Sequence, residues 1–151
     1  MGVQVINGDL LYASEDILGH QVNCKGVMGS GIAKAIKAAF PEAYQLYIDK
    51  CNHAVNKSEL LGYCQLIECS NGKTVANLFG QLHFGRGNQI YTNYDALRKA
   101  LTTLKTKAQL TPSSIALPYN IGCGLANGDW NVVEAMIQDV FSDYEVTLYR
   151  I

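Results

Sequence analysis

Three closely spaced glycines, Gly26, Gly29 and Gly31, form the first segment of the chain with residues suited to chemistry. They lie between an apolar stretch that ends at residue 23 and an amphipathic stretch that follows Ser30. Because glycine has no Cβ, the backbone here can approach a ligand closely. The free N–H groups and the positive dipole end of a helix that starts here attract phosphate. The loop therefore suits a phosphate or diphosphate, although a tight strand-to-helix turn also needs glycines for its geometry alone.

A second glycine-rich loop covers residues 120–128. It follows a predicted strand at 114–118 and precedes a predicted helix, which is the same order as at the first loop. In open α/β sheets, ligands bind beyond the carboxyl ends of the strands. If the two strands are parallel, the loops face each other across a cleft with backbone N–H donors on both walls. The ligand that suits such a cleft is elongated and carries a diphosphate.

The spacing of the first loop excludes two familiar nucleotide sites. A P-loop needs Lys-Ser or Lys-Thr after its last glycine, and here Gly31 is followed by Ile32 and Ala33. A dinucleotide fingerprint reads G-x-G-x-x-G, whereas this loop reads G-x-x-G-x-G. The sequence therefore favours neither NTP hydrolysis nor hydride transfer.

Cysteine and histidine usage indicates neither a disulfide framework nor a metal site. The five cysteines are scattered without a CxxC pair, and the three histidines form no ligand cluster with them. We therefore expect reduced thiols, a cytoplasmic location and no metal or other cofactor. Cys24 and Cys123 lie in the glycine loops, but a nucleophilic thiol would also need an electropositive setting and a base.

The elements that must position the two loops alternate along the chain. Apolar patterns and turn residues predict strands at 3–7, 17–23, 60–69, 73–79, 114–118 and 145–150. Helices are expected after Ser30, from Pro41, after Asn93 and after Asp129. This order predicts an α/β fold in which a mixed, mostly parallel sheet of about six strands lies between two helical layers, as a single domain over residues 1–151.

Composition narrows the possible partners. Hydrophobic residues make up 48% of the 151 residues, charged residues 17%, and the net charge is −1. The balance is that of a globular domain, and it lacks the basic excess of a general nucleic-acid binder. No apolar run reaches the length of a membrane span, and the N-terminus does not read as a secretory signal. We therefore expect no membrane partner.

Three motifs in order, Gly8-Asp9-Leu10, Gly29-Ser30-Gly31-Ile32-Ala33 and Ile121-Gly122-Cys123-Gly124-Leu125, resemble the macrodomain family. The resemblance covers essentially the whole chain. It looks closest to the branch that contains terminal ADP-ribose glycohydrolases related to the macrodomain of a chromatin remodeller. It is also similar to the yeast-type ADP-ribose 1″-phosphate phosphatases. The resemblance implies a three-layer α/β/α macrodomain whose partner is ADP-ribose or an ADP-ribosylated macromolecule.

The same resemblance implies roles for particular residues. Asp9 would accept the adenine amine, and the backbone of Leu10 would read the ring edge. The first loop would surround the diphosphate and the distal ribose, within reach of Asn23, and the second loop would close on the diphosphate from the other side. The loop residues concerned are Gly29, Ser30, Gly31, Ile32, Ile121, Gly122, Cys123, Gly124 and Leu125.

The sequence departs from the glycohydrolase pattern at its catalytic positions. Those enzymes use a lysine that attacks the distal ribose and an aspartate in the second glycine loop. Here Gly80 and Gln81 stand at about the lysine position, and Ala126 stands where the aspartate is expected. A water-mediated reaction would need another base, for which Asp129 and His20 are candidates. Asp129 also suits the N-cap of the last helix, and His20 suits a structural hydrogen bond.

Two functions follow from the resemblance and stay open at this point. The first is a hydrolase that acts on ADP-ribosyl adducts or on ADP-ribose 1″-phosphate. The second is a module that binds ADP-ribose without turnover. An unrelated nucleotide-binding domain would require the cleft to prefer another nucleotide.

Overall fold

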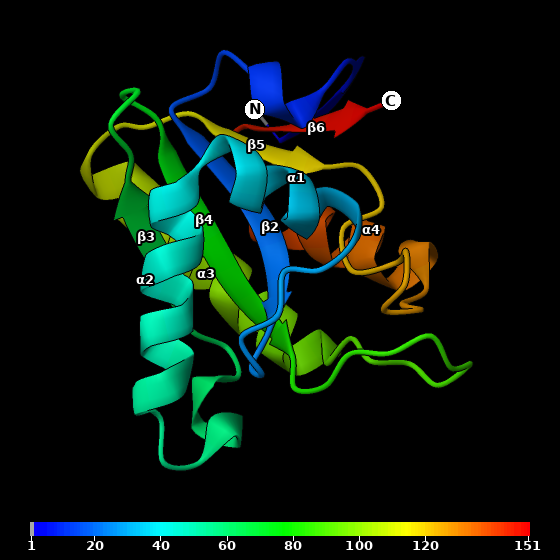
Figure 1. Cartoon of the computed structure of the whole chain (residues 1–151). Helices are drawn as coiled ribbons and strands as arrows, with labels where there is room; N and C mark the ends of the chain where they lie inside the picture. Colours follow the sequence, from blue (N-terminus) through cyan, green and yellow to red (C-terminus); the bar gives the residue numbers. More distant parts are fainter. Residues whose placement is uncertain (1) are drawn as a thin grey trace.

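The computed structural model describes residues 2–151 and contains a six-stranded sheet with the order β1-β6-β5-β2-β4-β3 (Figure 1). All neighbouring strands are parallel except β3 and β4, which form an antiparallel hairpin. The prediction of a mixed, mostly parallel sheet is therefore confirmed. The strands are β1 (Val3–Asn7), β2 (Ile17–Asn23), β3 (Cys64–Glu68), β4 (Thr74–Gln81), β5 (Ile115–Pro118) and β6 (Val146–Arg150).

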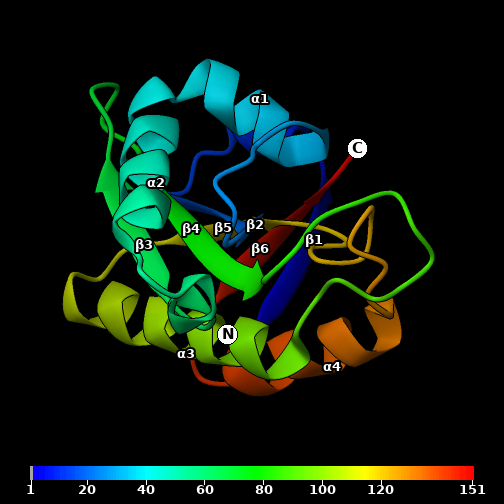
Figure 2. The ribbon, with the colours of Figure 1, turned by 60° about the horizontal axis from the view of Figure 1, so that its bottom comes forward.

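Helices cover both faces of this sheet, as Figure 2 shows. Helices α1 (Gly31–Ala39) and α2 (Pro41–His53) lie on one face, and α3 (Tyr94–Leu110) and α4 (Trp130–Val140) lie on the other. Short 3-10 helices span Leu10–Tyr12 and Lys57–Leu60. The predicted three-layer arrangement is thus confirmed. No helix within residues 2–151 is both long and apolar enough to cross a membrane.

The core is divided between the two faces of the sheet. One large apolar cluster joins α3 and α4 to the sheet, and two smaller clusters lie beneath α1 and α2. Strand β2 is buried along its whole length, as expected for a central parallel strand covered on both sides. The first glycine loop follows directly after this strand and connects it to α1.

Two predicted element boundaries were wrong. Residues 60–63 do not extend β3, because Asn56 caps a 3-10 helix over Lys57–Leu60 and the strand begins only at Cys64. Strand β4 continues beyond residue 79 to Gln81, which forms an isolated bridge with Thr92. The Asn71-Gly72 pair predicts a two-residue hairpin turn, but the turn contains the three residues 70–72, because the N–H of Cys69 donates to the carbonyl oxygen of Lys73 and Gly72 takes φ +87°.

The topology brings both glycine loops to one edge of the sheet. Strands β2 and β5 are direct parallel neighbours, with Ile17 opposite Ile115 and Leu18 opposite Ala116. The two loops that follow these strands therefore begin at neighbouring points of the same sheet edge. This confirms the sequence argument that parallel strands bring the two loops together at that edge.

Candidate functional site

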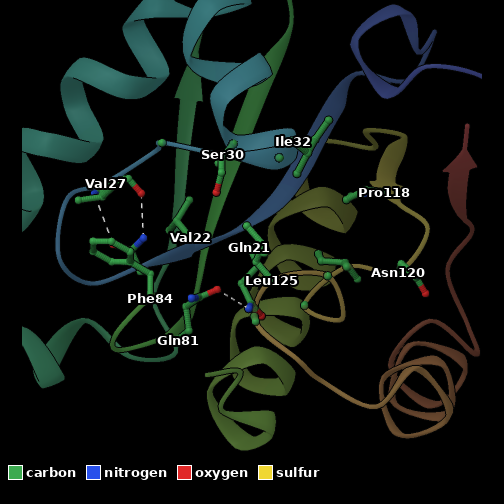
Figure 3. Close-up of a pocket in the computed structure, with 18 of the residues that line it drawn as sticks. Gln21, Val22, Val27, Ser30, Ile32, Gln81, Phe84, Pro118, Asn120 and Leu125 are labelled. Atoms are coloured by element: carbon green, nitrogen blue, oxygen red, sulfur yellow. Dashed lines mark hydrogen bonds between the residues drawn. The ribbon is translucent and has the colours of Figure 1, made fainter. Parts of the chain in front are cut away.

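A cavity of about 480 Å³ lies at the carboxyl edge of β2, β4 and β5 (Figure 3). Both glycine loops form its walls, and the segment between β4 and α3 closes one end. A volume of this order is typical of small-ligand sites. Its lining residues are Gln21, Val22, Asn23, Val27, Gly29, Ser30, Gly31, Ile32, Ala33, Gln81, Phe84, Gly85, Arg86, Pro118, Tyr119, Asn120, Ile121, Gly122, Gly124, Leu125 and Ala126.

The first loop is shaped by the side chain of Asn23. Its Oδ1 accepts from the backbone N–H of Lys25 at 2.9 Å, and its Nδ2 donates to the carbonyl oxygen of Val27 at 2.8 Å. The buried hydroxyl of Tyr47, on α2, lies 2.7 Å from the Asn23 carbonyl oxygen and 2.9 Å from its Oδ1. Asn23 therefore holds the curve of the loop as well as lining the cavity.

The N-terminus of α1 opens onto the cavity without a side-chain cap. Ser30 occupies the N-cap position, but its hydroxyl makes no capping hydrogen bond, contrary to the role its sequence position suggests. In Figure 3 this hydroxyl points into the cavity. By contrast, Asn93 and Asp129 cap α3 and α4 through the N–H groups of Ala96 and Asn131. The uncapped first turn of α1 is therefore available to an anion.

The second loop is fixed by hydrogen bonds to the segment that leads into α3. The carbonyl oxygen of Ala126 accepts from the N–H groups of Tyr91 and Thr92. Asn127, at φ +62°, donates to the carbonyl oxygens of Gly87 and Gln89, at 2.8 Å each. The two segments therefore form one connected wall.

The segment over residues 82–91 contributes Phe84 and Arg86 to the cavity. Phe84 is half exposed. Among the described residues that line the cavity, Arg86 is the only one with a charged side chain, and no carboxylate, lysine, histidine or cysteine is present. The electrostatics of the site thus favour an anionic ligand.

The structure brings most of the predicted ligand-binding residues together. Nine of them line the cavity: Asn23, Gly29, Ser30, Gly31, Ile32, Ile121, Gly122, Gly124 and Leu125. The other five predicted site residues, Asp9, Leu10, Cys123, His20 and Asp129, are not among the lining residues.

Asp9 and Leu10 follow β1, which β6 separates from β5 in the sheet, and neither residue lines the cavity. The Asp9 carboxylate caps the 3-10 helix by accepting from the N–H of Leu11 at 2.9 Å. The Leu10 side chain is buried in the core beneath α1. Their roles toward adenine remain predictions that rest on the resemblance.

His20 is completely buried, and its Nε2 lies 2.6 Å from Oδ1 of Asn77. The Asn77 amide nitrogen donates to the Ala43 carbonyl and to Oε1 of Gln65, so Asn77 Oδ1 is an acceptor and His20 Nε2 carries the proton. Burial lowers the pKa of His20 to about 4, although the bond to Asn77 opposes this. The geometry supports the structural role of this residue and gives no path from its ring to the cavity.

Cys123 lies within the second loop, and Asp129 follows the loop as the N-cap of α4. The Asp129 carboxylate accepts from the N–H of Asn131 at 2.9 Å, which is the helix-capping role named as its alternative. Burial, and then the charge of Asp129, raise the pKa of the Cys123 thiol to about 11. Burial likewise raises the pKa of the Cys24 thiol to about 11. Both thiols are therefore protonated at neutral pH and are poor nucleophiles.

Sequence reasoning missed several cavity residues. Gln21 follows His20 on a strand that reads as uniformly buried, and Phe84 and Arg86 lie in a polar loop without a motif. The bridge between Gln81 and Thr92 draws that loop to the cavity, and a long-range pairing of this kind has no local sequence signal. The available hint was an aromatic and a cationic residue on either side of a glycine, in the order Phe84, Gly85 and Arg86.

Comparison with known proteins agrees with this geometry. The family model described as "Macro domain" matches residues 20–137. An ADP-ribose 1″-phosphate phosphatase from Meyerozyma guilliermondii is 31% identical over 88% of this chain and 90% of its own length. A DNA ADP-ribosyl glycohydrolase from Mycobacterium tuberculosis is 28% identical over 95% of this chain, which spans 40% of that relative's length.

A solved structure shows the same architecture. The macrodomain of Mycobacterium tuberculosis DarG superposes with a TM-score of 0.80 at 28% identity, covering 97% of this chain and 96% of that one. The family match extends over well over half of the chain and includes both glycine loops. Because the family model covers most of the chain and the fold agrees with a solved macrodomain, this chain belongs to the Macro domain family.

Proposed function

We propose that this chain is a single macrodomain that binds ADP-ribose in the two-loop cavity and hydrolyses ADP-ribosyl adducts or ADP-ribose 1″-phosphate. The observation that carries the binding proposal is the uncapped N-terminus of α1, which faces the second glycine loop across a cavity with no acidic side chain among its described residues. Backbone N–H donors and Arg86 supply positive potential for a diphosphate. The names of the relatives support the hydrolytic part of the proposal.

The strand order supports one orientation of the ligand. Asp9 follows β1, the two glycine loops follow β5 and β2, and Gln81 ends β4. From β1 to β4 there are four strand spacings, or about 19 Å at the usual separation of neighbouring strands. A ligand with its adenine near Asp9 and its diphosphate between the loops would place its distal ribose near Gln81.

A second candidate function is binding without turnover. It is favoured by one observation, namely that no carboxylate, lysine, histidine or cysteine is among the described residues that line the cavity. Incubation of the purified protein with ADP-ribose 1″-phosphate, and separately with mono-ADP-ribosylated protein and DNA, distinguishes the two. Released phosphate or free ADP-ribose supports the hydrolase, and tight binding of ADP-ribose with no release supports the binding module.

We propose a cytoplasmic location, which suits the five free thiols of the chain. Because the net charge is −1, without the basic excess of a nucleic-acid binder, we also propose that the general affinity of the chain for nucleic acid is low. A nucleic-acid substrate would then be recognised mainly through its ADP-ribose group.

Isothermal titration calorimetry with ADP-ribose, ADP and AMP tests the binding proposal. We expect ADP-ribose to bind much more tightly than AMP, because AMP lacks the diphosphate that both glycine loops would contact. Equal affinities for the two would contradict a two-loop diphosphate site.

The Asp9→Ala variant tests the adenine end. We expect ADP-ribose affinity to fall by about 1–3 kcal/mol if the carboxylate accepts the adenine amine. Because Asp9 also caps a 3-10 helix, a loss of about 1 kcal/mol in the free energy of unfolding is expected as well. Asp9→Asn keeps a capping oxygen and separates the two effects, and normal binding by Asp9→Ala would place adenine elsewhere.

A further inference from the structure

A chain of side-chain hydrogen bonds connects the floor of the cavity to the second glycine loop. Gln21, on β2, donates from Nε2 to Oε1 of Gln81 at 2.8 Å and to Oγ1 of Thr92 at 2.9 Å. Thr92 in turn donates to the carbonyl oxygen of Gly122 at 2.6 Å. Figure 3 shows Gln21 and Gln81 side by side with the bond between them.

The direction of these bonds fixes both amide groups. Because the Thr92 hydroxyl gives its proton to Gly122, its oxygen accepts from Gln21, and the Gln21 nitrogen must face Thr92. The Gln81 oxygen accepts from Gln21, while its nitrogen donates one hydrogen to the carbonyl oxygen of His83 at 2.8 Å. A primary amide has two N–H groups, so Gln81 keeps a second donor at the cavity.

This arrangement leaves one buried atom without a partner. Oε1 of Gln21 is buried and accepts no hydrogen bond within the described chain. It lies between two glycines, since a Cβ added to Gly80 would lie 2.3 Å from it and one added to Gly122 would lie 3.0 Å from it. An unsatisfied buried oxygen reduces stability, and such defects are typical of functional sites.

We infer that Gln21 is a positioning residue, which aims the free N–H of Gln81 at a hydroxyl oxygen of the ligand's terminal ribose. The inference rests on the proposed ADP-ribose site and assigns the end of that site over β4. A residue at position 81 must both accept from Gln21 and donate to the ligand. A lysine cannot accept, so the Gln21 amide also explains why a glutamine suits this position.

Calorimetry with ADP-ribose and ADP on Gln21→Leu and Gln81→Leu tests the assignment. Each variant should bind ADP-ribose about 3- to 10-fold more weakly and ADP with unchanged affinity, because ADP lacks the terminal ribose. The double variant should bind no more weakly than Gln81→Leu alone, because Gln21 acts through Gln81. If wild-type protein fails to bind ADP-ribose, the proposed function fails; if it binds and both single variants bind normally, this inference alone is overturned.

Gly80→Ala provides a test from outside the cavity, because Gly80 is not among the lining residues. Its methyl group would displace the Gln21 side chain, because the added Cβ would lie 2.3 Å from Oε1, 2.8 Å from Cδ and 3.1 Å from Cγ of Gln21. We expect the same 3- to 10-fold loss toward ADP-ribose and none toward ADP. In a Gln21→Ala background the substitution should have no further effect on affinity.

The melting temperature separates positioning from a merely structural role. Gln21→Leu removes two hydrogen bonds but also the unpartnered oxygen, so its melting temperature should stay close to that of wild type. A large fall in melting temperature with normal affinity in the folded protein would show that Gln21 only supports the fold.

Discussion

Gly124→Glu should abolish measurable ADP-ribose binding while leaving thermal unfolding close to that of the unmodified protein. Gly124 lines the cavity, and a Cβ added to it would have no atom within 4 Å. Its backbone does not have the left-handed φ that disfavours other residues. A carboxylate here would lie near the proposed diphosphate, and repulsion between charges about 4 Å apart near a protein surface amounts to about 4 kcal/mol, or on the order of 1000-fold in affinity.

The control for this variant is Gly124→Gln, which adds nearly the same volume without the charge. If the site holds a diphosphate, the glutamine variant should lose much less affinity than the glutamate variant. Calorimetry and thermal unfolding on the same preparations give both quantities. Equal affinity for Gly124→Glu and wild type would mean that the second loop does not contact the anion.

Gly31, the first residue of α1, allows a test of the first loop, because the carboxylate of a Gly31→Glu variant would lie beside the proposed diphosphate and should abolish ADP-ribose binding. Gly31 has open space around it but adopts φ +60°, so any substitution there adds backbone strain of roughly 1–2 kcal/mol. Gly72 has φ +87° and equally open space, but lies in the β3–β4 turn, outside the cavity. Gly72→Glu should therefore lose about as much thermal stability as Gly31→Glu but should bind ADP-ribose with wild-type affinity. Thermal unfolding and calorimetry on both variants measure the two quantities.

The sequence was sufficient where local chemistry decides the structure. Asn93 and Asp129 cap their helices, and Gly72 forms the hairpin turn, because each choice depends on a few neighbouring residues. The meeting of the two glycine loops was also predictable, since it follows from parallel strands that precede each loop. These features account for the fold and for the two walls of the cavity.

The floor and the closed end of the cavity depend on contacts distant in the sequence. Gln21 bonds to Thr92, and Asn127 holds the segment that carries Arg86, and neither pairing leaves a local pattern. Burial is equally hard to predict for a single polar residue. His20 looked like a possible base because it precedes the first loop, yet its ring is buried against Asn77, whose amide nitrogen donates to the Ala43 carbonyl of α2.

The burial of His20 also predicts how stability depends on pH. In the folded protein its pKa is lowered to about 4, whereas an unfolded histidine titrates near 6.5. As pH falls below 6.5 the unfolded chain binds a proton that the folded protein does not, so stability that is present at neutral pH is lost between about pH 6.5 and pH 4. Between pH 7 and pH 5 this loss should be about 2 kcal/mol.

His20→Gln is the matched variant, because a glutamine amide can still donate to Oδ1 of Asn77 but does not titrate. Urea unfolding at pH 7 and pH 5 should show a smaller loss of unfolding free energy for His20→Gln than for wild type, by about 2 kcal/mol. His83→Gln replaces an exposed histidine and should keep the wild-type loss. Working at pH 5 and above limits the contribution of Asp16 and Glu42, whose hydrogen bonds to Ser114 and Ser70 lower their pKa values. A His20→Gln variant that loses as much stability as wild type would show that this imidazole is protonated in the folded protein.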